Sequence, residues 1–364
     1  MKVIMLSTDR TMFERGSPAR QRMEEYAAAF GKLSIIVFAT QSAGFVPDVG
    51  VKLSLYPTNS RSRFSYMHDA VRLAETLMPA DVISAQDPFE TGRAGKMIAK
   101  RHGIPLHVQI HTNFLAPGFA GAHWPLNWAR LMFAPGVIRA AASIRTVSSA
   151  IKEALEKKYH PRAPISVLPI YADISGVPPA HVKHARFKTA LLVVSRLEKE
   201  KRVDVAIRAL KTARDAGIDA GLDIVGNGRE EGRLRHLAKR LGVADFVEFH
   251  GFQSQTAPYY ASADAILYPG APYEGFGMAI IEALAAGVPV LANGVGIARE
   301  AGATIVHGTG PDDFGAALVA FLKKFTPAAE GPRKSLLLYK PYASKEEYLQ
   351  KFAADIAVAA QRHN

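Results

Sequence analysis

The chain has 364 residues, of which 48% are hydrophobic and 21% are charged. This balance is typical of a globular protein, and the length allows two domains that each bury a core. The absence of cysteine excludes disulfides and thiolate metal sites, and it fits a reducing compartment. No run approaches the ~18 apolar residues of a membrane span, and the opening KVIMLS predicts a β-strand rather than a signal-peptide core.

The formal net charge of +12 leaves nucleic acid, anionic lipid and phosphorylated small molecules open as partners. Residues 1–175 hold 21 Lys+Arg and 13 Asp+Glu, so this half carries +8 of the excess. The basic residues are scattered and form no polybasic tail. We therefore expect no nucleic-acid partner.

In the first half, short β-branched runs alternate with amphipathic stretches, which predicts an α/β domain with a parallel sheet covered by helices. The expected strands are Val3–Leu6, Ser34–Ala39, Val51–Leu55, Val82–Ala85, Leu106–Ile110, Ile144–Val147 and Ile165–Leu168. The expected helices are Ala19–Phe30, Met67–Leu77, Thr91–His102, Leu126–Ala142 and Ser149–Lys158.

The pattern lapses over Ile174–Ala190, a stretch rich in Pro, His and Lys that we interpret as a linker. It then restarts, which predicts a second α/β domain over residues 186–340, after a first domain over 1–175. The expected strands are Ala190–Ser195, Leu222–Val225, Phe246–Phe249, Ala265–Tyr268, Val288–Ala292 and Thr304–Val306. A last helix is predicted over Lys345–Gln361.

In open α/β sheets, ligands bind outside the carboxyl ends of the strands. Two such domains facing each other would form a cleft, so the residues that follow strands are the candidate site residues. After the strand Ala265–Tyr268 comes PYEGFGMAIIEALAAGVPV, with Glu274 in a loop and Glu282 about one turn into a helix that begins near Met278. An unpaired buried carboxylate is costly, so each should meet a polar partner. The alternative is a helix cap and a surface ion pair.

Three further segments follow strands. In SRLEKEKRVD, a guanidinium at Arg196 and an ammonium at Lys201 could together bind a diphosphate, or form a solvated basic turn. Gly16 precedes Ser17 and Pro18, which are suited to cap and start a helix. His111 follows a strand and is either functional or a structural hydrogen-bonding residue.

The segment GNGREEG (Gly226–Gly232) resembles a dinucleotide-binding loop only superficially. Its glycine spacing is wrong, and no acidic strand end stands about 20 residues further on. We therefore do not expect a nicotinamide cofactor.

The Glu-x7-Glu pair in EGFGMAIIEALAAGVPV, together with SRLEKEKR and LDIVGNGREEGRLRHLA, resembles the GT4 family of retaining nucleotide-sugar glycosyltransferases. The resemblance is strong from Ala190 to about Gly310 and weaker before residue 175. It implies the GT-B fold: two Rossmann-like domains facing across a cleft, with the C-terminal helix (about 345–364) crossing back to the N-terminal, acceptor-side domain.

The resemblance also implies residue roles. Glu282 would bind the ribose hydroxyls of the donor nucleotide, and Glu274 the hydroxyls of the donor sugar. Arg196 and Lys201 would hold the diphosphate. His111 would stand near the transferred sugar. Backbone N–H groups would assist in binding the diphosphate, near Gly16, Gly275, Phe276 and Gly277. The segment from Tyr268 to Tyr273 would shape the sugar pocket.

The function implied is transfer of a hexose, with retention, to a lipid-linked, polysaccharide or small-molecule acceptor. We expect no metal and no other cofactor, because the cations would stabilise the departing diphosphate. The sequence PDD at Pro311–Asp313 is better explained as a helix cap than as a metal-binding motif. A GT-B sugar-nucleotide epimerase is an alternative, and a basic nucleic-acid-binding module a more remote one.

Both tryptophans, Trp124 and Trp128, lie in GFAGAHWPLNWARLMFAPGVIRAA beside Arg130. Interfacial aromatic residues next to basic ones suit a membrane surface. The alternative is a core helix with two packed aromatic side chains. The expected location is cytoplasmic, with a peripheral position at the inner membrane face left open.

Overall fold

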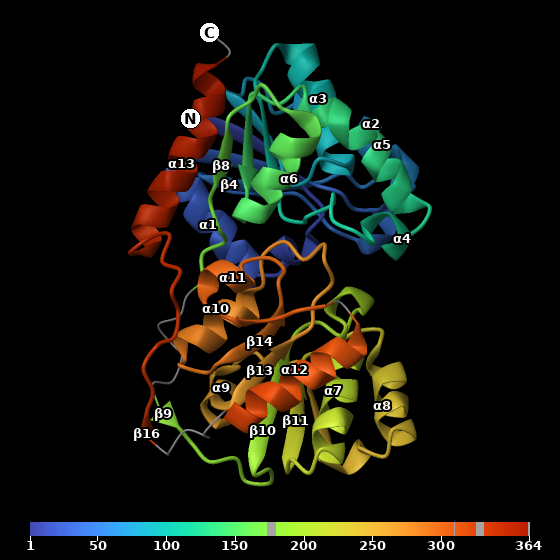
Figure 1. Cartoon of the computed structure of the whole chain (residues 1–364). Coiled ribbons are helices and arrows are strands. Elements are labelled where there is room, and N and C mark those ends of the chain that lie inside the picture. Colours follow the sequence, from blue (N-terminus) through green and yellow to red (C-terminus); the bar gives the residue numbers. More distant parts are fainter. Residues whose placement is uncertain (173–179, 309, 325–330, 363–364) are drawn as a thin grey trace. The chain divides into compact units, whose positions relative to one another are not determined.

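The computed structural model describes residues 1–172, 180–308, 310–324 and 331–362, which divide into two compact units (Figure 1). Unit 1 comprises residues 1–115, 119–171 and 341–364, and unit 2 comprises residues 116–118 and 172–340. Each unit is a sheet of mainly parallel strands combined with helices, as the alternating sequence pattern predicted.

The sheet of unit 1 has eight strands in the order β3-β4-β2-β1-β5-β6-β7-β8. All neighbours are parallel except β3 and β4. Because the chain runs outward from β1 in one direction and from β5 in the other, the sheet has a switch point between these two strands. The strands are β1 (Lys2–Ser7), β2 (Lys32–Val37), β3 (Asp48–Val49), β4 (Leu53–Pro57), β5 (Val82–Ala85), β6 (Leu106–Ile110), β7 (Ser143–Thr146) and β8 (Ile165–Val167).

The α-helices of unit 1 are α1 (Pro18–Phe30), α2 (Tyr66–Glu75), α3 (Glu90–His102), α4 (Phe119–Ala122), α5 (Leu126–Ile138), α6 (Ser149–Tyr159) and α13 (Lys345–Gln361). The start of α1 confirms the capping prediction: the Ser17 side chain accepts a hydrogen bond from the Arg20 N–H, and Pro18 is the first helical residue.

The C-terminal helix α13 belongs to unit 1 and lies beside α1 (Figure 1). Tyr348, Phe352 and Ile356 of α13 are buried with Tyr26 and Phe30 of α1. The rings of Tyr26 and Phe352 meet edge to face with centroids 4.6 Å apart. The return of the last helix to the first unit is therefore confirmed.

The sheet of unit 2 is entirely parallel, with the order β12-β11-β10-β13-β14-β15 and a switch point between β10 and β13. Two further strands, β9 (Ala180–His181) and β16 (Gly331–Pro332), form an antiparallel pair. The six strands of the sheet are β10 (Thr189–Val194), β11 (Ala220–Val225), β12 (Val247–Gly251), β13 (Ala265–Tyr268), β14 (Val290–Asn293) and β15 (Thr304–Val306).

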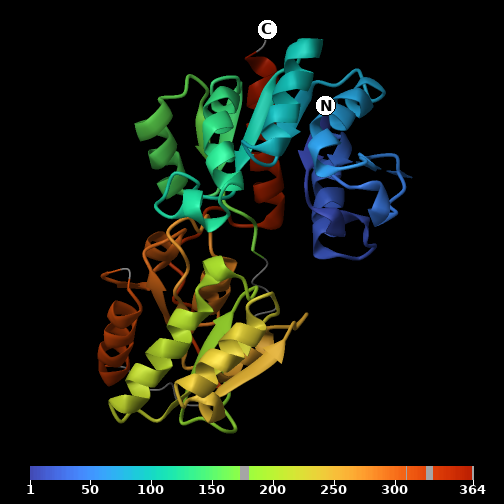
Figure 2. The ribbon, with the colours of Figure 1, turned by 90° about the vertical axis from the view of Figure 1, so that its right-hand side faces the viewer.

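The α-helices of unit 2 are α7 (Val203–Asp215), α8 (Glu231–Arg240), α9 (Ala257–Ser262), α10 (Met278–Ala285), α11 (Ala298–Ala301) and α12 (Pro311–Lys324). α7 and α8 cover the sheet (Figure 2), and α7 also packs along α12. Apolar side chains of these three helices bury alternate strand residues such as Leu191, Leu222 and Ile224. Asp313 accepts a hydrogen bond from the Gly310 N–H at the start of α12, which confirms its prediction as a cap.

The structure differs from the predicted elements mainly at their ends. The helix expected over Leu126–Ala142 ends at Ile138, because the Ala142 N–H already donates to the Leu106 carbonyl and joins the sheet. The short β3 was missed. Of the predicted linker Ile174–Ala190, residues 174–179 lie outside the described residues, whereas 180–181 form β9 and 189–190 belong to β10.

Candidate functional site

The switch point of unit 2 brings together the segments that follow β10 and β13. The Ala271 N–H donates to the Glu200 carbonyl over 2.9 Å, which ties the two segments to each other. Asn293, at the end of β14, donates its side-chain amide to the carbonyls of Pro269 (2.8 Å) and Gly270 (3.1 Å). These backbone contacts fix the loops that carry the predicted site residues.

Lys201 and Glu274 form the centre of this site, 73 positions apart in sequence. The Lys201 ammonium lies 2.5 Å from Glu274 Oε2, and both side chains are largely buried, with 17% and 14% of their surface exposed. Burial and the neighbouring Glu274 carboxylate, to which the Tyr268 hydroxyl donates, raise the Tyr268 pKa well above its usual value. The expected polar partner of Glu274 is therefore a cation and a phenol, not a helix N-terminus.

Lys201 is presented by a strained turn. Residues Lys199–Lys201 form a single 3₁₀ turn, and Arg202 then adopts φ +52° before α7 begins at Val203. A left-handed conformation is uncommon for a residue with a side chain, and such strain is concentrated at functional sites. The turn ends with the Lys201 N–H donating to the Glu198 carbonyl over 2.9 Å.

Arg196 lies two residues after the end of β10, and its side chain is 70% exposed, with its guanidinium 3.2 Å from Glu200. The neighbouring Ser195 hydroxyl is buried and has no hydrogen-bond partner among the described residues. A surface ion pair of this kind contributes little to stability. Arg196 is therefore free, on energetic grounds, to exchange Glu200 for an anionic ligand.

Glu282 lies one turn into α10, as predicted, and its Oε2 accepts a 2.6 Å hydrogen bond from the buried Tyr260 hydroxyl. Burial and the adjacent carboxylate raise the Tyr260 pKa well above its usual value, so the phenol remains a proton donor. Tyr260 was missed by the sequence analysis. The phenol occupies one carboxylate oxygen of Glu282 and holds the side chain in one orientation.

α10 begins at Met278, as predicted, with Gly277 as its N-cap residue at φ +102° and no side chain capping it. Gly275, Phe276 and Gly277 are all buried. The Phe276 carbonyl accepts from the Ile297 N–H over 2.9 Å. The uncapped first turn, at the carboxyl-end edge of the sheet, is suited to an anion.

The first two glycines of GNGREEG have a packing role. A Cβ atom at Gly226 would lie 1.9 Å from the Ser195 carbonyl oxygen, and one at Gly228 would lie 2.3 Å from that of Leu197. The Leu197 N–H donates to the Asn227 carbonyl over 2.8 Å. The loop after β11 therefore supports the turn that carries Arg196, and this close packing requires glycine at positions 226 and 228.

Unit 1 has its own pocket at the carboxyl ends of β1, β5, β6 and β7, with a volume of about 160 Å³. It is lined by His111, Arg22, Arg145, Gln86, Gln109 and Tyr26, together with Asp9, Met12, Ala19, Met23 and Ile170. Gly16 is exposed at φ +81° before α1, and a Cβ atom there would meet nothing within 4 Å. The structure thus places His111 and Gly16 in unit 1, and Arg196, Lys201, Glu274 and Glu282 in unit 2.

The environment of His111 keeps its imidazole neutral. Burial, followed by the positive charges of Arg145 and Arg22, lowers the His111 pKa to about 3. Arg22 makes no salt bridge in the part of the chain that the structure describes, whereas Arg20 pairs with Glu24 and Asp48. The pocket therefore has a neutral imidazole beside two arginines, Arg22 and Arg145, that form no salt bridge within the described part of the chain.

A buried network of hydrogen bonds, centred on Arg145, holds the side chains that line this pocket. The Arg145 guanidinium, almost inaccessible to solvent, donates to Gln109 Oε1 (2.9 Å), the Leu168 carbonyl (3.0 Å) and the Tyr348 hydroxyl (3.1 Å). The Tyr348 and Tyr26 hydroxyls are 2.7 Å apart. No short motif signals this network, because its members come from β6, β7, α1 and α13.

A second branch of the network runs between neighbouring strands, from Gln109 of β6 to Asp355 of α13. Gln109 donates to the Ser84 hydroxyl (3.1 Å), which lies 2.9 Å from His107 Nδ1, and His107 Nε2 lies 3.0 Å from Asp355 of α13. Although burial opposes ionisation of Asp355, its hydrogen bond with His107 and the charges of His107 and Arg145 lower its pKa overall.

The segment with both tryptophans is exposed, so the core-helix alternative is wrong. In and before α5, the exposed apolar side chains are Trp124, Leu126, Trp128, Met132 and Phe133. Arg93 of α3 places its guanidinium 3.9 Å from the Phe133 ring centroid, and Arg130 pairs with Glu90. Among the described residues, no helix has the length and apolar character needed to cross a membrane.

Comparisons with known proteins agree with this geometry. A family model described as "Glycosyl transferases group 1" matches residues 181–309, and one described as "Glycosyl transferase 4-like domain" matches residues 18–170. A GDP-mannose-dependent alpha-(1-6)-phosphatidylinositol dimannoside mannosyltransferase of Mycobacterium tuberculosis is 34% identical, over 73% of this chain and 72% of the relative. A D-inositol 3-phosphate glycosyltransferase of Nocardiopsis dassonvillei is 29% identical, over 87% and 80%.

Solved structures show the same fold at low identity. HepE of Anabaena, crystallised with UDP, matches with a TM-score of 0.67 and 17% identity, over 99% of this chain and 98% of its own. The sucrose-phosphate synthase of Thermosynechococcus elongatus matches with a TM-score of 0.72 and 16% identity, over 99% and 97%. The epimerase alternative finds no support in these matches. The chain therefore belongs to the GT4-type glycosyltransferases of GT-B fold, enzymes that transfer a sugar from a nucleotide-sugar donor.

Proposed function

We propose that this enzyme transfers a hexose, with retention of configuration, from a nucleotide diphosphate sugar held by unit 2 to an acceptor bound by unit 1. The Lys201–Glu274 pair at the unit 2 switch point is the observation that carries the proposal. It places a cation and a hydrogen-bond acceptor side by side, which are the two groups that a sugar diphosphate requires.

Each side chain of the site binds a different chemical group of the donor. Lys201 and Arg196 neutralise the diphosphate, and the uncapped first turn of α10 adds backbone donors near Gly277. Glu274 accepts hydrogen bonds from sugar hydroxyls. Glu282, oriented by Tyr260, uses its remaining oxygen for the ribose hydroxyls. No divalent metal is needed at the diphosphate, because the two cations and the helix dipole stabilise the charge that develops on it.

Retention follows from a same-face displacement through an oxocarbenium-like state, in which the departing phosphate takes the acceptor proton. No carboxylate then forms a covalent bond to the sugar. His111 stays neutral at pH 7, since its pKa is lowered to about 3, so it can hydrogen-bond a hydroxyl of the transferred sugar without adding charge.

The unit 1 pocket suits a polyol acceptor that carries an anionic group. Arg22 and Arg145 line it, and the pocket's one carboxylate, Asp9, accepts from the Thr11 N–H. Relatives named for inositol 3-phosphate and for phosphatidylinositol mannosides fit this chemistry. Polysaccharide acceptors remain compatible, because the pocket of about 160 Å³ would hold only a terminal unit.

A lipid-linked acceptor would bring the enzyme to the cytoplasmic face of a membrane. The exposed aromatic residues Trp124 and Trp128, with Arg93 nearby, form the surface that we propose for peripheral contact. In a flotation assay with liposomes that contain anionic lipid, the wild type should rise with the liposomes. The Trp124→Ser/Trp128→Ser variant should stay in the lower fraction. Equal flotation of both, or of neither, would remove the membrane contact from the proposal.

A thermal-shift screen against UDP-, GDP- and ADP-sugars tests the function itself, because a ligand that binds only the native state raises the melting temperature. One donor class should stabilise the protein, and the same donor should be consumed only when an acceptor is present. If no nucleotide sugar raises the melting temperature, the proposal fails.

A further inference from the structure

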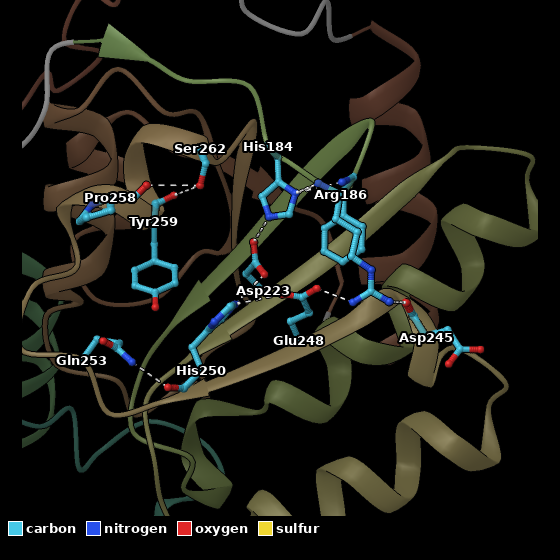
Figure 3. A network of polar contacts seen from close by, with 11 residues as sticks. His184, Arg186, Asp223, Asp245, Glu248, His250, Gln253, Pro258, Tyr259 and Ser262 are labelled. Atoms are coloured by element: carbon cyan, nitrogen blue, oxygen red, sulfur yellow. Dashed lines mark hydrogen bonds and ion pairs between the residues drawn. The ribbon is translucent and has the colours of Figure 1, made fainter.

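Away from the donor site, three potential metal-ligating side chains gather on one face of the unit 2 sheet (Figure 3). Asp223 of β11 and Glu248 of β12 are register partners, and His250 is two residues further along β12. Because strand side chains alternate between faces, Glu248 and His250 share the face of Asp223. One ligand atom from each residue lies within 4.8 Å of the other two.

Each carboxylate presents one oxygen to the shared point and keeps the other occupied. Asp223 Oδ1 lies 2.8 Å from His250 Nε2, whereas Oδ2 lies 3.0 Å from His184 Nε2. Glu248 Oε2 lies 3.8 Å from His250 Nε2, whereas Oε1 is paired with Arg186. Metal sites in proteins are built in this way: hydrogen bonds from a second layer of residues orient the coordinating carboxylates.

His184 belongs to that second layer and is not itself a ligand. Its Nδ1 accepts from the N–H groups of Phe187 (2.9 Å) and Arg186 (3.1 Å). Because Nδ1 serves as an acceptor, Nε2 is the ring nitrogen that donates to Asp223 (Figure 3). His250 has its Nε2 directed at both carboxylates, and its ring packs against Tyr259 with centroids 4.8 Å apart.

We propose that Asp223, Glu248 and His250 bind one divalent transition-metal ion, with zinc as the probe of choice. Zinc takes oxygen and imidazole ligands at about 2.0–2.2 Å, which places the ligands of a tetrahedral site roughly 3.4 Å from one another. His250 Nε2 lies 2.8 Å from Asp223 Oδ1 and 3.8 Å from Glu248 Oε2, on either side of that spacing, and all three ligand atoms lie within 4.8 Å of one another. The imidazole disfavours magnesium and calcium, which prefer oxygen ligands throughout. The imidazole would coordinate the ion through Nε2 with its ring proton on Nδ1, and water would fill the fourth position.

The ion would link the edge strand β12 to β11. Its ligands are distinct from Arg196, Lys201, Glu274 and Glu282, so its expected effect is on the stability of unit 2 and not on the chemistry of transfer. Glu248 and His250 are partly exposed, with 30% and 24% of their side-chain surface accessible, which gives an ion a route of entry.

Isothermal titration of the full-length, tag-free chain with zinc chloride tests the proposal. We expect saturable binding of one ion, weakened at least ~10-fold by Glu248→Gln and by His250→Gln, and unchanged by His236→Ala, which removes an exposed histidine of α8. Saturating zinc should raise the melting temperature of the wild type by ~5 °C, and the same zinc concentration should raise that of Glu248→Gln by clearly less.

The absence of saturable binding by the wild type would overturn the site. So would a loss of affinity in His236→Ala equal to that in His250→Gln, because binding would then reflect surface histidines in general. Circular dichroism of each variant checks that it is folded. Glu248→Gln keeps the shape of the side chain, so it decides the outcome if His250→Gln does not fold.

Discussion

Each of the two sheets has a switch point at its centre, but the charged side chains around the two switch points are arranged differently. In unit 2, each cation already has a carboxylate partner: Lys201 pairs with Glu274, and Arg196 with Glu200. In unit 1, Arg22 has no carboxylate partner among the described residues, and Arg145 is held by neutral groups. His111 stays uncharged beside them.

The difference suits the two pockets to different ligands. Paired charges hold their geometry without a ligand and can exchange partners for phosphates and hydroxyls. A pocket with excess positive charge is instead stabilised when a negative group enters it. The same charges add to burial, the larger cause, in lowering the His111 pKa. This difference supports the proposal that the donor binds to unit 2 and an acceptor with anionic character to unit 1.

The largest expected effect comes from the paired site. Lys201→Ala and Glu274→Ala should each lower turnover by at least ~10³-fold, equivalent to about 4 kcal/mol, because each removes a group that acts on the reacting diphosphate or sugar. Both variants should stay folded, as judged by circular dichroism. Lys199→Ala, an exposed residue of the same turn, should keep wild-type turnover. Full activity of the double variant would rule out this site.

In unit 1, substitution of the buried Arg145 should lower the free energy of unfolding. Arg145→Met would leave Gln109 Oε1 and the Leu168 carbonyl without their buried donor, and should lower the free energy of unfolding by ~3 kcal/mol. Urea denaturation measures the loss, and Arg139→Met, at an exposed position after α5, is the matched control. Equal midpoints for the two variants would show that the network does not support the pocket.

The pH dependence separates the units further. The folded pKa of His111 lies near 3, below the unfolded value of about 6.5, so only the unfolded chain takes up this proton between those values. Stability from this group is complete above pH 6.5 and is lost as the pH falls towards 3. Between pH 7 and pH 5, the wild type should lose ~1–2 kcal/mol more than His111→Gln. The exposed-site variant His123→Gln should follow the wild type, whereas identical losses in all three proteins would contradict the assignment.

The smallest effect is expected behind the ribose site. Tyr260→Phe removes the hydroxyl that orients Glu282, and it should weaken donor binding by a few-fold and stability by ~1 kcal/mol. The neighbouring Tyr259→Phe should bind the donor as the wild type does. Calorimetric titration with the nucleotide sugar provides the measurement. An unchanged affinity in Tyr260→Phe would show that Glu282 does not need the phenol.

Local sequence predicted the segment that carries Glu274 and Glu282, for a physical reason. The strand Ala265–Tyr268 and the helix start at Met278 were predicted as the structure has them, and Glu274 and Glu282 lie on this continuous segment. Local propensity and glycine positions therefore determine that geometry. Lys201 could be anticipated as a cation, but its pairing with Glu274 spans 73 residues and required the fold.

The contacts between distant elements of unit 1 could not be predicted from the sequence. The helix Lys345–Gln361 was predicted correctly, yet nothing in its sequence indicates that Tyr348 meets Arg145, 203 positions away, or that Asp355 meets His107, 248 positions away. Likewise, Arg22 resembles any exposed helix residue until the sheet places it in the pocket. Contacts between distant elements are fixed by packing, and a single sequence carries no local signal for them.

The central claim is that Lys201 holds the donor diphosphate in unit 2. Calorimetric titration of the wild type, Lys201→Ala and Lys199→Ala with the free nucleoside diphosphate of the preferred donor tests it most directly, because neither acceptor nor turnover is involved. We predict that Lys201→Ala binds ~10- to 100-fold more weakly, whereas Lys199→Ala binds as the wild type does. Equal affinity of the wild type and a folded Lys201→Ala would contradict the claim.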